Sequence, residues 1–183
     1  MPKKEKYKLR KAIILDRDGI INKIVIRNGK ASSPRKLGEF KFLPNIKKYL
    51  ESFREMGFLN IVFTNQPDIS RGLLKREELR KMHKFISEIL PIDEIKFCPH
   101  DDNDNCSCRK PKPGLILEAA KKWSIDLKKS YVIGDGWKDM AAGKRAGCKT
   151  FLMRRKYNKN LQSGFDFGVN NLKEVIKIIR KPL

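Results

Sequence analysis

The sequence predicts an α/β fold in which helices cover both faces of a parallel sheet. Two observations support this prediction: short apolar runs recur along the chain, and segments with helical periodicity lie between them. Buried parallel strands are typically continuous runs rich in Ile, Val and Phe. Strands that alternate with helices form a sheet covered on both sides, so we expect a Rossmann-like arrangement.

Five apolar runs are the expected strands. Each is rich in Ile, Val, Leu or Phe and is followed by polar residues or glycine. The runs are 12–15, 60–63, 95–97, 131–133 and 150–153. Ligands of open parallel sheets bind beyond the carboxyl ends of the strands, so the residues that follow these runs are the candidates for function.

Five segments are the expected helices. They are 45–56, 76–90, 114–124, 137–146 and 171–180. In the second, Leu79, Met82, His83, Ile86 and Leu90 recur at spacings of three and four, which places them on one face. We interpret His83 as a histidine at the edge of the core.

Two irregular segments interrupt this alternation. Residues 22–43 include a short hairpin, predicted around the turn Asn28-Gly29. Residues 98–113 hold three prolines and three of the four cysteines. Because neither segment is long enough to form a large cap domain, we expect a single domain over 12–183, preceded by a basic tail over 1–11.

The composition favours a soluble, folded protein. Of 183 residues, 40% are hydrophobic and 34% are charged, which allows a packed core and disfavours wholesale disorder. No apolar run approaches the ~20 residues of a membrane-spanning helix, and the N-terminus lacks the apolar stretch of a signal peptide. We therefore expect a cytoplasmic monomer that does not associate with membranes.

The net charge of +21 comes from 42 Lys and Arg against 21 Asp and Glu. Such a charge suits nucleic acid, an anionic lipid surface or a phosphorylated substrate as a partner. The cations are spread along the whole chain, and only the tail over 1–11 is dense. A nucleic-acid footprint would cluster on one face, so nucleic acid stays open as a partner but is not favoured.

Two aspartates follow the first expected strand. Asp16 and Asp18, with Gly19 next, lie where the chain leaves extended geometry, so their carboxylates can converge on one site. Paired acids suit either a divalent cation or a nucleophile with its acid. Asp-x-Asp-Gly also occurs in calcium loops, but the further acidic positions and the closing glutamate of those loops are missing here.

Polar groups also follow other expected strands. Residues 64–66, Thr-Asn-Gln, could donate hydrogen bonds to phosphate or hydroxyl oxygens, or cap the next helix. Asp135 and Asp139 follow the fourth strand. Arg109 and Lys110 precede a helix start, a placement suited to anion binding. We expect these groups to share one edge of the sheet.

Four metal-ligand side chains lie within eleven residues. They are Cys98, His100, Cys106 and Cys108. Clustered cysteines in a chain expected to be cytosolic favour a metal over a disulfide, although a loop of reduced thiols is the alternative. Three thiolates and one imidazole form a complete tetrahedral Zn²⁺ set with no position for water, so we expect a structural zinc that braces the loop before Arg109. Cys148 lies apart and is expected to be a small buried side chain.

The combined motifs resemble the haloacid dehalogenase superfamily of phosphatases. The order is Asp-x-Asp-Gly, a strand-end Thr, a Lys and Gly-Asp-x-x-x-Asp. The segments V-F-T-N-Q, C-P-H…C-x-C-R-K-P-K-P-G and G-D-G-W-K-D are similar to the branch that contains D-glycero-D-manno-heptose-1,7-bisphosphate 7-phosphatase and histidinol-phosphatase. The resemblance covers residues 12–153 and implies a compact phosphatase.

The resemblance implies a role for each motif residue. Asp16 would be the nucleophile that forms an aspartyl-phosphate, and Asp18 the general acid and then the base. Mg²⁺ would be held by Asp16, the Asp18 carbonyl and Asp135, because a carboxylate that attacks a phosphate dianion meets like-charge repulsion. Thr64 and Lys110 would neutralise the phosphoryl oxygens.

Other residues would contact the substrate. Arg109 would orient it, and four further contacts are implied. They are Asn22, Asn65, Gln66 and Arg71. Asp139 would order its loop or a metal-bound water rather than bind Mg²⁺ directly. Gly136 stands where the heptose enzymes often have a lysine, so that contact would pass to Lys138.

The resemblance favours a sugar bisphosphate as substrate, with D-glycero-D-manno-heptose 1,7-bisphosphate as the leading candidate. Arg71-Gly72 is similar to the heptose enzymes, whereas the five residues between His100 and Cys106 are similar to histidinol-phosphatase, which stays an alternative. A nucleic-acid 3′-phosphatase is a second alternative. A non-catalytic scaffold is a third, and the intact Asp16 and Asp18 argue against it.

Overall fold

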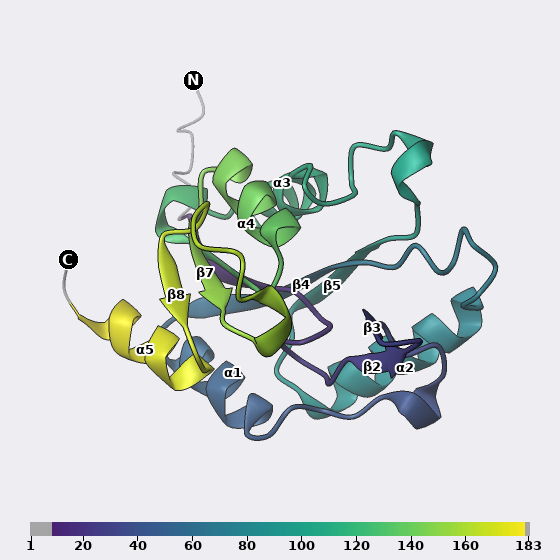
Figure 1. The fold of residues 1–183 in the computed structure, drawn as a ribbon. Helices are drawn as coiled ribbons and strands as arrows, with labels where there is room; N and C mark the ends of the chain where they lie inside the picture. Colours follow the sequence, from purple (N-terminus) through teal and green to yellow (C-terminus); the bar gives the residue numbers. More distant parts are fainter. Residues whose placement is uncertain (1–8, 182–183) are drawn as a thin grey trace.

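The computed structural model describes residues 9–181, which contain a six-stranded parallel sheet (Figure 1). Its strands are β1 Lys11–Leu15, β4 Phe58–Asn65, β5 Glu94–Cys98, β6 Tyr131–Gly134, β7 Lys149–Met153 and β8 Phe167–Val169. They lie in the order β5-β4-β1-β6-β7-β8, and all neighbours are parallel. The predicted α/β fold is confirmed, and the short edge strand β8 is an addition that the sequence did not predict.

Five α-helices connect and cover the strands. They are α1 Ile46–Glu55, α2 Arg76–Ile89, α3 Gly114–Trp123, α4 Trp137–Ala146 and α5 Leu172–Arg180. Each lies within its predicted segment. Short 3₁₀ turns occur at Leu37–Glu39, Asp102–Asp104, Leu127–Lys129 and Lys156–Asn158.

The sheet has an apolar core on each face. Helices α1, α2 and α5 pack on one face, and α3 and α4 pack on the other. Strand β1 contributes to both, because Ile13 and Leu15 point into the first core and Ala12 and Ile14 into the second. Burial on both faces explains why the strand sequences are continuous apolar runs.

The sheet has its switch point at β1. Strand β4 pairs on one side of β1 and β6 on the other, so the chain leaves β1 where the connections diverge. The loop after β1 carries the predicted hairpin, formed by β2 Val25–Arg27 and β3 Lys30–Ser32. Asn28 and Gly29 both have positive φ, as the tight hairpin turn requires. Functional groups are therefore expected at the carboxyl end of β1.

The N-terminal tail is described only in part. Of the basic segment predicted over 1–11, residues 1–8 lie outside the described residues. Arg10 bridges to Ile125, and Lys11 begins β1. Among the described residues, none of the helices combines the length and apolar character that a membrane crossing requires.

Candidate active site

A cavity of about 360 Å³ lies at the carboxyl ends of β1, β4 and β6. Eleven residues singled out from the sequence line it. They are Asp16, Asp18, Thr64, Asn65, Gln66, Arg71, Arg109, Lys110, Asp135, Lys138 and Asp139. Parallel strands bring these groups together from segments far apart in the chain, as expected for the edge of an open α/β sheet.

A buried lysine joins two of the aspartates. Nζ of Lys110 lies 2.7 Å from Oδ1 of Asp16 and 2.6 Å from Oδ1 of Asp139. The ammonium also faces the ring of Phe63, 4.3 Å from its centroid. The other oxygen of Asp139 accepts a hydrogen bond from the main-chain N–H of Gly136 at the start of α4. Asp139 therefore holds Lys110 in place.

Burial and neighbouring charges shift the pKa values of this cluster. Burial raises the pKa of Asp16 well above its ordinary value, and the charges of Asp139 and Asp135 raise it further, against the effect of Lys110. Burial alone would lower the pKa of Lys110, but Asp139 and Asp16 raise it above its ordinary value. Lys110 is therefore a permanent cation at the floor of the cavity.

Asp135 is held by the loop that follows β7. Burial and the charge of Asp139 raise the pKa of Asp135 to about 6. The Tyr157 hydroxyl donates to Oδ2 of Asp135, and the Asn158 amide donates to its main-chain oxygen at 2.8 Å. The sequence did not identify Tyr157 or Asn158, because the segment after β7 has no periodicity or motif that marks it.

The glycine of the Asp-x-Asp-Gly motif is required by a close approach. Gly19 has a φ of +85°, and a Cβ at this position would lie 2.0 Å from Oδ2 of Asp135. The Arg155 guanidinium donates to the Gly19 carbonyl at 3.1 Å. The absent side chain lets the loop after β1 pack against the loop after β6.

The carboxylates suit a divalent cation. One oxygen from each of Asp16, Asp135 and Asp139 lies within 4.8 Å of the others. Carboxylate oxygens are the ligands that Mg²⁺ prefers. Both oxygens of Asp139 are engaged, one by Lys110 and the other by the Gly136 N–H, whereas Asp16 contacts Lys110 through Oδ1 alone, so Asp16 and Asp135 are the side chains that fit the cation best.

Asp18 lies in a cage of hydrogen-bond donors. Its carboxylate accepts from Arg17 at 2.9–3.2 Å, from Asn22 and Ser33 at 2.8 Å, and from Gln66 at 2.9 Å. Burial raises the pKa of Asp18, but Arg17 and these hydrogen bonds outweigh it and lower the pKa below its ordinary value. The cage favours the ionised form and fixes the direction of the carboxylate.

The structure gives Asn22 a different location from the one expected. Asn22 is fully buried and is not part of the cavity lining. Its amide donates to Oδ1 of Asp18 and to the Lys23 carbonyl. The prediction that Asn22 contacts substrate is therefore corrected, because its donors are used inside the protein to support Asp18. Ser33 joins the same support from the hairpin and was missed by the sequence.

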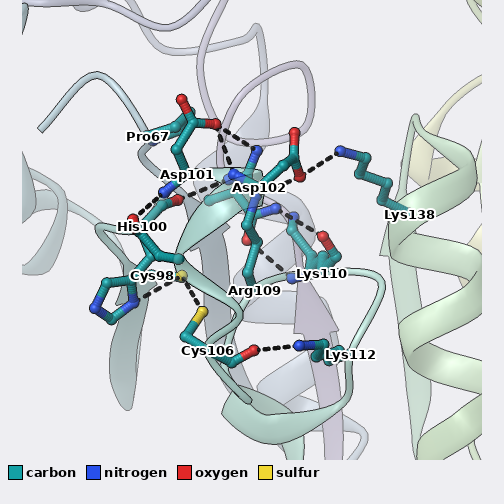
Figure 2. A network of polar contacts seen from close by, with 12 residues as sticks. Pro67, Cys98, His100, Asp101, Asp102, Cys106, Arg109, Lys110, Lys112 and Lys138 are labelled. Atoms are coloured by element: carbon teal, nitrogen blue, oxygen red, sulfur yellow. Dashed lines mark hydrogen bonds and ion pairs between the residues drawn. The ribbon is translucent and has the colours of Figure 1, made fainter. Parts of the chain in front are cut away.

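The four Cys and His side chains of the predicted metal set lie together. Figure 2 shows three of them, Cys98, His100 and Cys106. The three Sγ–Sγ distances among Cys98, Cys106 and Cys108 are 3.2–3.5 Å, and Nδ1 of His100 lies 3.4–3.6 Å from two of the sulfurs. A tetrahedral zinc site with normal bond lengths has edges of roughly 3.5–3.8 Å. The four side chains therefore fit such an ion.

The same loop positions the cations of the cavity (Figure 2). Nε of Arg109 lies 2.8 Å from Oδ1 of Asp102, and its Nη1 donates to the His100 carbonyl at 3.0 Å. The Asn65 amide bonds to both the N–H and the carbonyl of Lys110 at 3.1 Å. Asn65, predicted as a substrate contact, thus also fixes the main chain at Lys110.

Two further cations stand at the rim. Arg71 pairs with Asp101 at 2.5 Å, and Lys138 lies 3.3 Å from Asp102. Both line the cavity, and both of their acidic partners come from the loop that carries His100. Guanidinium and ammonium groups at this rim suit an anionic ligand that takes the place of their aspartate partners.

Known phosphatases are similar to this chain in sequence. The family model described as HAD-hydrolase-like matches residues 107–164. The chain is 37% identical over 176 residues to the D-glycero-beta-D-manno-heptose-1,7-bisphosphate 7-phosphatase of Helicobacter pylori strain J99, covering 93% of this chain and 97% of that one. It is 33% identical to the D-glycero-alpha-D-manno-heptose-1,7-bisphosphate 7-phosphatase of Campylobacter jejuni, covering 93% and 96%.

A solved structure agrees with these relatives. The D,D-heptose 1,7-bisphosphate phosphatase from B. bronchiseptica, complexed with magnesium and phosphate, superimposes with a TM-score of 0.79 at 27% identity, covering 92% of this chain and 97% of that one. The resemblance drawn from the motifs is confirmed, and so is the expectation of a phosphatase. The chain belongs to the heptose-bisphosphate phosphatase family of haloacid dehalogenase-like hydrolases.

Proposed function

We propose that this protein removes one phosphate from a sugar bisphosphate, D-glycero-D-manno-heptose 1,7-bisphosphate, through an aspartyl-phosphate on Asp16. The observation that carries the proposal is the buried contact of 2.7 Å between Lys110 and Asp16 at the floor of a cavity rimmed by cations. The relatives from Helicobacter pylori and Campylobacter jejuni are named for heptose 1,7-bisphosphate, which supports the choice of sugar.

Asp16 is the nucleophile in this mechanism. A carboxylate oxygen of Asp16 attacks phosphorus, and the bond between phosphorus and the sugar oxygen breaks. Lys110 and Thr64 neutralise the phosphoryl oxygens as charge develops on them. Lys110 also lowers the pKa of Asp16, against the burial that raises it, and so favours the ionised nucleophile. One buried cation thus serves both the nucleophile and the transferred group.

Asp18 moves the protons. Its acid form gives a proton to the departing sugar oxygen, and the resulting carboxylate takes a proton from the water that attacks the aspartyl-phosphate. Inorganic phosphate and the Asp16 carboxylate are released, and Asp18 is protonated again. The donors around Asp18 lower its pKa in the free protein, and the negative charge of an entering phosphate raises it.

Two metals support this site in the proposal. Asp16, the main-chain carbonyl of Asp18 and Asp135 would hold Mg²⁺, which when bound supplies positive charge against the repulsion between carboxylate and phosphate. Zn²⁺ would be structural, because its four ligands leave no open position. They are Cys98, His100, Cys106 and Cys108. The zinc loop leads directly into Arg109 and Lys110.

The rim favours a second phosphate over a nucleic-acid base. Arg71, Arg109 and Lys138 offer cationic donors around the cavity. Tyr157 is the one aromatic side chain among the described residues that line it. Readers of extruded bases usually stack them on aromatic platforms, whereas donors and guanidinium groups suit hydroxyls and phosphate.

We further propose that residues 12–183 act as one domain in a cytoplasmic monomer. One continuous sheet with an apolar core on each face supports the single domain, and a thiolate metal site suits a reducing compartment.

A panel of phosphomonoesters tests the proposal. We expect kcat/KM to be highest for the heptose bisphosphate, lower for its monophosphate, and lower again for histidinol phosphate and for 3′-phosphorylated DNA. Asp16→Asn should reduce turnover by at least ~10³-fold, as loss of an essential catalytic group does, while Asp104→Asn on the exposed zinc loop serves as the control. Best activity on DNA ends at physiological salt would overturn the choice of substrate. An Asp16→Asn protein of normal rate would overturn the mechanism.

A further inference from the structure

Arg17 lies between the two aspartates of the motif yet does not line the cavity. Its side chain is fully buried. Nε and Nη2 lie 3.2 and 3.0 Å from Oδ1 of Asp18, and Nη2 lies 2.9 Å from Oδ2. Because the guanidinium is planar and its donors are fixed in that plane, the orientation of Arg17 sets three of the six side-chain contacts that direct the Asp18 carboxylate.

The far side of the guanidinium contacts helix α2. Nη1 of Arg17 lies 3.4 Å from Nε2 of His83, a residue 66 positions along the chain. The His83 ring packs edge-on against Phe97 of β5, with centroids 5.6 Å apart. Burial and the charge of Arg17 lower the pKa of His83 to about 3. The ring is therefore neutral, with its proton on Nδ1 and a lone pair on Nε2 that can accept from Arg17.

The His83 contact is costly to lose. Among the residues that the structure describes, His83 is the hydrogen-bond partner of Nη1 of Arg17. A buried N–H group without an acceptor carries a desolvation penalty, so the guanidinium would turn towards another acceptor. Asp18 would then lose the Arg17 contacts that share in orienting its carboxylate, and the donors of Asn22, Ser33 and Gln66 alone would hold it less firmly. Proton transfer to a departing oxygen depends strongly on such an orientation.

We propose that His83 is a positioning residue for the acid–base step: it accepts from Arg17 and thereby fixes the carboxylate of Asp18. Helix α2 thus controls a group at the end of β1 without contact to the substrate. The inference rests on the role of Asp18 in the proposed function.

The test compares two classes of phosphomonoester. An aryl phosphate such as p-nitrophenyl phosphate releases a stable phenolate that needs no proton, whereas an alkyl phosphate releases an alkoxide that does. The kcat/KM value reports only the steps up to formation of the aspartyl-phosphate. Misplacement of the acid therefore lowers kcat/KM for the alkyl ester selectively.

Three substitutions of His83 separate the hydrogen bond from packing. His83→Leu removes the acceptor, and in His83→Asn the amide is too short to replace Nε2. Both should lower kcat/KM about tenfold for the alkyl phosphate and less than about twofold for the aryl phosphate, a part of the ~10²-fold or more that a general acid supplies. His83→Gln carries an oxygen near the place of Nε2 and should restore most of the loss. Phe97→Leu perturbs the packing of the ring but leaves the acceptor, so it should not discriminate between the esters.

Equal losses on both esters would show that His83 acts only through packing and would overturn the inference, as would a Gln variant that behaves like Leu. If His83→Leu does not fold, the Asn and Gln variants carry the test alone. Asp18→Asn is measured beside them. If Asp18→Asn does not discriminate between the esters, the proposed role of Asp18 fails. If it does discriminate and the His83 variants do not, only the present inference fails.

Discussion

Nζ of Lys110 lies 2.7 Å from Oδ1 of Asp16, and the two side chains are only 5% and 12% exposed. The residues are 94 positions apart in the chain and meet because the irregular segment 98–113 brings Lys110 to the carboxyl end of β1. In the proposed mechanism, a charged pair in this position favours the ionised form of the nucleophile and supplies a cation for the phosphoryl group.

Lys110→Met should impair both stability and activity. Removal of one partner from a buried charge cluster leaves Asp16 and Asp139 uncompensated, which costs about 3 kcal/mol of unfolding free energy. The phosphoryl charge also loses its cation, so kcat should fall at least ~10²-fold. Urea denaturation and steady-state kinetics measure the two effects, with the exposed Lys121→Met as control. A fully active Lys110→Met protein would contradict the assigned role.

Gly19→Ala should disrupt the site, whereas Gly29→Ala should not. Both glycines have positive φ, so both substitutions strain the backbone by about 1 kcal/mol. Only at Gly19 does the new Cβ meet an obstacle, at 2.0 Å from Oδ2 of Asp135, while nothing lies within 4 Å of a Cβ at Gly29. We expect loss of Mg²⁺ affinity, measured by calorimetry, and of most activity in the first variant alone. Similar behaviour of the two variants would show that backbone strain, and not contact with Asp135, decides the outcome.

Cys106→Ser should remove zinc and stability together. Purified protein should contain about one zinc per chain, and the variant should contain none, because the tetrahedral set is incomplete. Metal-binding free energy in such a loop is also folding free energy, so the melting temperature should fall by about 10 °C. As a control, the Cys148→Ser variant, which changes a buried cysteine outside the cluster, should bind as much zinc as the unmodified protein. A metal-free protein of unchanged stability and activity would refute the structural role.

His83 should make the protein less stable in acid. Its pKa is about 3 in the folded protein, below the ordinary value of 6.5, so the unfolded chain binds the proton more readily between these two pH values. The free energy of unfolding should therefore fall as the pH falls through 6.5 towards 3. At pH 5 the contribution amounts to about 2 kcal/mol. Urea denaturation at pH 7.5 and pH 5 should show this difference between wild type and His83→Gln. Parallel pH profiles of the two proteins would contradict it.

Much of the fold could be predicted because its signals are local. Helix α4, Trp137–Ala146, has the predicted bounds, since its start after Gly136 and its end before Gly147 are both marked in the sequence. Strands such as β1 are apolar because both of their faces are buried. Strand β8 was missed because three residues at a sheet edge carry too short a pattern. Strand β8 is stabilised by its parallel pairing with β7, a contact that its own sequence does not indicate.

The sequence alone determined which residues meet at the sheet edge and which four side chains form the Cys/His cluster. Asp16 and Asp135 each follow a predicted strand. The carboxyl ends of parallel strands lie at one edge of the sheet regardless of the conformation of the connecting loops, so these two residues meet there. The three cysteines and the histidine likewise fall within the eleven residues from Cys98 to Cys108, so their side chains stay close in any conformation of that short segment.

The tertiary structure alone decided which groups support these residues. Asn22 turns inward to Asp18, Tyr157 reaches Asp135, and His83 contacts Arg17. The last two contacts join segments 22 and 66 residues apart, and no local pattern in either segment indicates its partner. A side chain's direction is set by the space and the donors around it after helices and loops have packed, so these contacts follow from the complete fold and not from any motif.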